Sequence, residues 1–78
     1  MNTNILHDIY TINRETNGED LAVSLAKYKA AHPGAVSHED DKAIREFIGA
    51  YGSTLAKAFD EGKEAFEAAA DACEAEGK

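Results

Sequence analysis

The sequence has little of several residue types, and each shortage narrows what the chain can be. Cys73 is the only cysteine in 78 residues, so no disulfide can form within the chain, and we expect a reducing compartment, the cytoplasm. No alternating run of β-branched residues indicates a strand, and no apolar run is long enough to span a bilayer. Residues 1–10 lack the basic and apolar regions of a signal peptide.

Basic residues are also scarce. Eight Lys and Arg residues stand against 15 Asp and Glu residues, which gives a formal net charge of -7. Such a charge repels the phosphates of nucleic acids and the anionic surface of membranes. We therefore expect neither direct nucleic-acid binding nor membrane binding, and the partner that suits this charge is a protein with a basic surface.

Large apolar side chains are few as well. Hydrophobic residues make up 44% of the chain, but 15 of them are alanine, and Ile, Leu, Val, Phe and Met together also number 15. A core of this size in one domain over residues 1–78 supplies only about 3–5 kcal/mol, so we expect help from self-association, that is, a homo-oligomer.

Helical spacing of apolar residues runs through most of the chain. Ile5, Ile9 and Ile12 predict a first helix over residues 3–15, for which Thr3 is a candidate cap. Thr16 and Glu19 have the spacing of a capping box, which predicts the start of a second helix. This helix presents Leu21, Leu25 and Tyr28 on one side and ends at His32-Pro33-Gly34.

A third helix is predicted from residue 38, where Ser37 and Asp40 again have capping-box spacing. Apolar or small residues then follow alternating steps of four and three, the pattern of a heptad seam: Ile44, Ile48, Tyr51, Leu55, Ala58, Gly62, Ala65, Ala69 and Ala72. Ordinary core packing under the first two helices explains this seam, and so does a contact with a second chain.

Two interpretations of this last stretch remain open. Residues 38–76 could form one helix about 58 Å long, which would extend beyond its own domain unless a second chain covered it. Alternatively, Gly49 and Gly52 weaken the helix by roughly 1 kcal/mol each, and Ser53 caps a fourth helix. Either way the fold class is all-α, a small bundle of three or four helices with a long or glycine-broken C-terminal helix.

The most suggestive feature is a row of acids near the C-terminus. On a regular helix, steps of four, three, four and three place five carboxylates on one stripe: Asp60, Glu64, Glu67, Asp71 and Glu74. Like charges at this spacing cost about 0.2–0.5 kcal/mol per pair, so helix stability does not explain the stripe. A solvated face that keeps the protein soluble is one interpretation. A surface that imitates nucleic acid and occupies a basic groove of a protein is the other.

Aromatic residues beside the seam are further candidates for partner contact. Phe59 and Phe66 flank the seam seven residues apart, and Tyr51 lies on it. Cys73 continues the same spacing and has no neighbouring cation in sequence to lower its pKa, so we expect a buried structural thiol.

Signatures of cofactor, metal or catalytic chemistry are missing from the sequence. None of His7, His32 and His38 has the spacing of a helical zinc pair, and there is no glycine-rich phosphate loop or nucleophile elbow. We expect no cofactor, no metal and no enzymatic activity.

This profile, a very short acidic helical chain without catalytic motifs, is similar to that of many phage-encoded inhibitors of host defence, such as anti-CRISPR and antirestriction proteins. The likeness is one of size and charge and covers no aligned residues. It implies a noncatalytic inhibitor that blocks a nucleic-acid-processing complex, possibly as a nucleic-acid mimic. The alternative is a helical adaptor or assembly subunit that acts through oligomerisation.

Overall fold

The computed structural model describes residues 3–18 and 20–76, and within them the chain forms four helices and no strand. The helices are α1 (Thr3–Glu15), α2 (Leu21–Ala31), α3 (His38–Glu61) and α4 (Lys63–Glu76). The predicted all-α bundle is therefore confirmed, and the bounds of α1 are those predicted from the spacing of its isoleucines.

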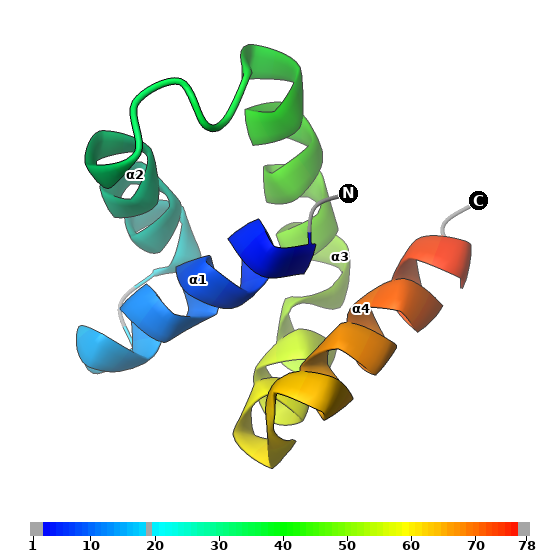
Figure 1. Cartoon of the computed structure of the whole chain (residues 1–78). Coiled ribbons are helices and arrows are strands. Elements are labelled where there is room, and N and C mark those ends of the chain that lie inside the picture. Colours follow the sequence, from blue (N-terminus) through cyan, green and yellow to red (C-terminus); the bar gives the residue numbers. More distant parts are fainter. Residues whose placement is uncertain (1–2, 19, 77–78) are drawn as a thin grey trace.

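The four helices pack around α1. Figure 1 shows α3 and α4 as an antiparallel hairpin, with α1 crossing it and α2 on the side of α1 away from α4. Helix α1 contacts all three of the other helices. The radius of gyration is 11.5 Å, the value expected for a compact chain of this length.

The core is small and draws on every helix. Leu6, Ile9 and Tyr10 are buried at i, i+3 and i+4 on α1, the stripe that faces the bundle in an amphipathic helix. The other helices contribute the remaining buried members of the cluster: Leu25, Tyr28, Ile44, Leu55, Phe66 and Ala70. Each fully buried large side chain contributes about 1.5–3 kcal/mol, and α1 supplies three of them, Leu6, Ile9 and Tyr10.

The connection between α1 and α2 differs from the predicted capping box. Thr16 belongs to the end of α1, because its hydroxyl donates to the carbonyl oxygens of Ile12 and Asn13 at 3.0 and 3.1 Å. Asn17 has φ 59°, and the Gly18 amide donates to Asn13 at 2.9 Å, which together form the helix-ending motif.

The residue that caps α2 is Asp20, whose side chain accepts from the Ala22 amide at 2.9 Å. Aspartate competes with threonine for this role, and here it stands directly before the first helical residue. Glu19, the other half of the predicted box, lies outside the described residues. Thr3 is the first residue of α1 and not its cap.

The predicted start of α3 is confirmed. Ser37 is the N-cap, and its hydroxyl accepts from the Asp40 amide at 3.1 Å. Asp41, one turn on, binds Lys29 of α2 at 2.5 Å and Arg45 of α3 at 2.6 Å. The hydrogen bond from Lys29, and then that from Arg45, lowers the pKa of Asp41. This carboxylate ties the end of α2 to the start of α3.

The C-terminal stretch is not one helix: a glycine separates α3 from a fourth helix, as the second interpretation predicted, but the break does not lie at the predicted glycines. Helix α3 runs without a break through Gly49, Gly52 and Ser53, and the chain instead turns at Gly62. Gly62 has φ 119° and ψ 168°, a conformation that only glycine adopts readily. Its amide donates to Phe59 and its carbonyl accepts from the Phe66 amide, so one residue ends α3 and starts α4. No single helix of 58 Å exists.

Candidate functional site

Helix α4 is held on the bundle by one of its faces. Phe66, Ala70 and Cys73 are its buried residues, spaced so that they share that face. Cys73 is 6% exposed, which confirms the expected buried thiol. Because these residues are fixed in the core, the orientation of the rest of the helix is fixed as well.

A neighbouring face of α4 carries four carboxylates, and we call it the acidic face: Glu64, Glu67, Asp71 and Glu74. Glu64 and Asp71 are exposed, and Glu67 and Glu74 are half-buried. The four lie on consecutive turns over about 15 Å at 1.5 Å per residue. None of Glu64, Glu67 and Asp71 forms an ion pair within residues 3–18 and 20–76.

Asp60 does not belong to this face, which corrects the predicted stripe of five. It lies on α3, before the turn at Gly62, and Arg14 of α1 pairs with its carboxylate at 2.9 Å. The same guanidinium donates to the Ala56 carbonyl at 3.2 Å and lies 5.7 Å from the centre of the Phe59 ring. Asp60 thus has a partner inside the chain.

The three aromatic residues predicted to contact a partner, Phe59, Phe66 and Tyr51, differ in how much of each is exposed. Phe66 is 0% exposed, so its ring has no surface to offer a partner. Phe59 and Tyr51 are half-buried, and Tyr51 pairs with Phe47 at 5.1 Å between ring centres. The seven-residue spacing from Phe59 to Phe66 spans the turn at Gly62, and the two rings meet edge to face at 5.9 Å. The contact between Phe59 and Phe66 joins α3 to α4.

His7 joins this cluster, which the sequence did not predict. Its ring lies 5.1 Å from Phe59 and 5.5 Å from Phe66, centre to centre. The ring of Tyr10, one turn further along α1, lies 5.2 Å from Phe66. His7 and Tyr10 are at i and i+3, a spacing that could have signalled a shared aromatic face on α1.

The charge of α4 is not arranged for the stability of the helix. Five acids and one base lie within Lys63–Glu76, and the last turn contains no basic residue. Negative charge near a helix C-terminus is unfavourable, because the terminal carbonyls already carry partial negative charge. Glu74 and Glu76 are placed there nonetheless. The acidic face is therefore a cost to folding that needs another explanation.

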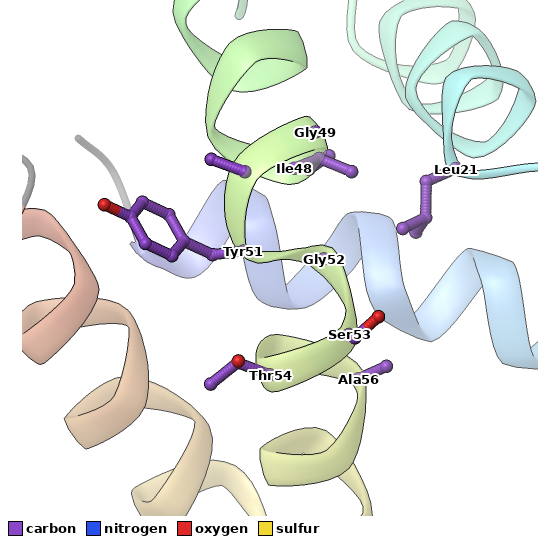
Figure 2. A pocket seen from close by; sticks show the side chains of 9 residues that line it. Leu21, Ile48, Gly49, Tyr51, Gly52, Ser53, Thr54 and Ala56 are labelled. Atoms are coloured by element: carbon purple, nitrogen blue, oxygen red, sulfur yellow. The ribbon is translucent and has the colours of Figure 1, made fainter.

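The surface also has a hollow of about 410 Å³ where α3 faces the start of α2. Figure 2 shows Leu21 of α2 on one side and the segment from Ile48 to Ala56 of α3 on the other. The described residues that line it include no carboxylate, imidazole, thiol or amine. The hydroxyls of Ser53 and Thr54 thus have no acid or base beside them in this hollow.

Two further properties bear on function. Among the residues that the structure describes, no three His, Cys, Asp or Glu side chains gather closely enough to hold a metal ion. In the same residues, no helix combines the length and the apolar composition needed to cross a membrane.

Comparison with protein-family models, with curated proteins and with solved structures finds no match to this chain.

Proposed function

We propose that the protein is a noncatalytic binding protein that docks the acidic face of α4 on a basic surface of another protein. Within this class we favour an inhibitor of a nucleic-acid-processing complex, in the manner of the small acidic inhibitors of phages. The observation that carries the proposal is the placement of Glu64, Glu67, Asp71 and Glu74 together on a helix whose adjoining face is anchored in the core.

Anchoring matters for affinity. Phe66, Ala70 and Cys73 fix α4 before any partner arrives, so binding does not have to order the helix. A fixed row of charges also steers a basic partner during encounter and sets its register. A flexible acidic tail of the same composition would also steer the partner, but it would have to be ordered on binding and would not set the register.

The charge density of the face suits a groove that normally holds phosphates. Four carboxylates over about 15 Å give one charge per roughly 5 Å, and one strand of B-DNA presents one per about 3.4 Å. The acidic face is shorter than the predicted stripe of about 21 Å, because the turn at Gly62 removes Asp60 from it. A groove that holds a few phosphates is the size that fits.

The test compares three forms of the full chain as bait in a cell lysate. The first is the natural chain, and the second carries Glu64→Gln, Glu67→Gln and Asp71→Asn. The third is a control with the same loss of charge at exposed positions on other helices: Asp8→Asn, Glu15→Gln and Glu46→Gln. We expect the natural chain and the control to retain the same protein, and the α4 variant to lose it.

The retained protein should also behave as one held by charge. Its release from the bait should rise steeply with salt. Duplex DNA should also release it, because DNA phosphates and the acidic face compete for the same basic groove. Circular dichroism checks folding, and the α4 variant should melt no lower than the natural chain, since it loses like-charge repulsion. Equal retention by the natural chain and the folded α4 variant would contradict the proposal.

The same variant separates the proposal from an adaptor that acts through oligomerisation. An adaptor of that kind should assemble as well or better once repulsion on α4 is removed. It should also retain its partners in the capture experiment.

A further inference from the structure

A second surface lies between α3 and α4. It is a groove of about 620 Å³, and we call it the outer groove. Its uncharged lining consists of small side chains from both helices: Thr54, Ala58, Ala65, Ala68 and Ala69. Side chains this small let the backbone of another helix approach closely, since the distance between packed helices is set by the residues at the contact.

Two opposite charges complete the lining of the outer groove. Lys57 and Glu61 are both exposed and stand one turn apart on α3. Neither side chain forms an ion pair or hydrogen bond with another residue in the described part of the chain, although the i, i+4 spacing would allow the two to pair with each other. Both charges are thus available to a molecule that enters the groove.

We infer that the outer groove is a self-association surface that takes the same groove of a second copy in a two-fold dimer. In such a dimer, a two-fold axis perpendicular to α3 makes the α3 helices of the two copies run in opposite directions. A residue that lies a given distance before the axis in one copy then faces the residue that lies the same distance after it in the other copy. With the axis between Lys57 and Glu61, each lysine faces the glutamate of the other copy. The surface is therefore complementary to itself in charge.

This inference is independent of the proposed function. Around α4, Ala65 and Ala69 lie about 100° or more from Glu64 and Asp71. Ala68, about 40° from Glu64, forms the edge of the outer groove beside the acidic face, so a dimer formed through the groove leaves most of each acidic face outside. It also does not require a long helix that projects from the domain, because α3 and α4 contribute jointly to the surface. Two acidic faces on one dimer would let it engage two basic surfaces at once.

Charge reversal tests the inference in the full chain. Lys57→Glu places two acids in each groove, and Glu61→Lys places two bases there, so each variant alone faces like charge with like. Sedimentation velocity over a concentration series should show the natural chain as a dimer, and each variant should dimerise about tenfold more weakly or worse. Mixing the two variants should restore association as a heterodimer, because every contact then joins opposite charges.

The double variant Lys57→Glu with Glu61→Lys should dimerise like the natural chain, which excludes misfolding as the cause of the losses. Neutralising Glu64, Glu67 and Asp71 should leave dimerisation unchanged or strengthen it, so failure of the acidic face and failure of the groove are distinguishable. A natural chain that stays monomeric up to millimolar concentration would overturn the inference. So would a dimer that neither charge reversal weakens, or one that the mixture fails to restore.

Discussion

The stretch around Gly49 and Gly52 and the turn at Gly62 invite comparison, because glycine acts in opposite ways at the two places. Two glycines and a serine within five residues leave α3 unbroken, whereas a single glycine ten residues later reverses the chain. Glycine only permits a break, and the surrounding contacts decide whether the chain takes it.

Those contacts differ clearly between the two places. Across the continuous stretch, the Tyr10 hydroxyl donates to the Gly52 carbonyl at 3.1 Å, and Arg14 donates to Ala56 one turn further on. Two side chains of α1 thus brace successive turns of α3. After the turn, Phe66 is buried in the core against Tyr10 of α1. Helix α4 can bring Phe66 to α1 only if the chain reverses its direction after α3.

The largest expected effect comes from removing the residue that holds α4 on the core. Phe66→Ala should cost about 3–5 kcal/mol, because it deletes a fully buried ring and leaves a cavity among the rings of His7, Tyr10 and Phe59. That is close to the total stability of a domain this small, so urea denaturation should find the variant largely unfolded.

Two milder variants keep this prediction testable. Phe66→Leu should remain folded with an intermediate loss of stability, and Phe47→Ala, which truncates a half-buried ring on α3, should cost less than Phe66→Ala. If Phe66→Ala were no worse than Phe47→Ala, the core would not be what holds the hairpin.

Changing the turn itself should have the next largest effect. Gly62→Ala should destabilise the chain by about 1–3 kcal/mol, because a side chain is strained at φ 119° and ψ 168°. An added Cβ would meet no atom within 4 Å, so backbone strain and not a clash is the cause. Thermal unfolding of the pure protein measures it. An alanine variant as stable as the natural chain would mean that the turn lies elsewhere.

Removing one brace of the continuous stretch should cost less. Tyr10→Phe should lower the free energy of unfolding by about 0.5–1.5 kcal/mol at neutral pH, because the Gly52 carbonyl loses the hydroxyl. Denaturant titration of the natural and variant chains gives this difference. No change in stability would show that the hydrogen bond does not support α3.

The same tyrosine gives a prediction on pH. Burial raises the pKa of Tyr10 to about 12 from 10.0, so the folded state favours the neutral hydroxyl. Its contribution is fully present below pH 10 and is lost as pH rises toward 12. Alkaline denaturation should therefore be less steep in this interval for Tyr10→Phe than for the natural chain. Identical curves for the two would contradict the assignment.

The smallest effect should be a gain. Gly49→Ala should stabilise α3 by about 0.5–1 kcal/mol, since a Cβ there meets nothing within 4 Å and alanine is the better helix former. Gly52→Ala should gain a similar amount, because its Cβ would make only ordinary van der Waals contacts with Ile48 at 3.7 Å and Tyr10 at 3.9 Å. A loss of stability for Gly49→Ala would show that α3 needs conformational freedom at this point.

Much of the fold was predictable from local patterns. The isoleucine spacing gives α1, and Ser37 with Asp40 gives the start of α3, because caps and amphipathic stripes depend on residues a few positions apart. The cap of α2 was missed because Asp20 and Thr16 are both able to cap, and only the structure shows that Thr16 is used by α1.

The turn at Gly62 was not predictable in the same way. It depends on contacts between Phe66 and α1 that are more than 50 positions apart in sequence, and on Arg14 reaching Asp60. The heptad pattern, with its alternating steps of four and three, continues through Gly62, so the spacing of the residues does not indicate a turn there. For the same reason four of the five stripe acids share a helix as expected, and Asp60 does not.

The most direct test of the account is a nuclear magnetic resonance measurement on the full chain that combines Cα chemical shifts with contacts between aromatic rings. The account predicts helical shifts that continue through Gly49 and Gly52, an interruption at Gly62, and cross-peaks between the rings of Phe66 and Tyr10, whose centres lie 5.2 Å apart. Helical shifts that pass through Gly62 without interruption, together with no cross-peak between these rings, would contradict it. The acidic face would then have no anchored helix to carry it.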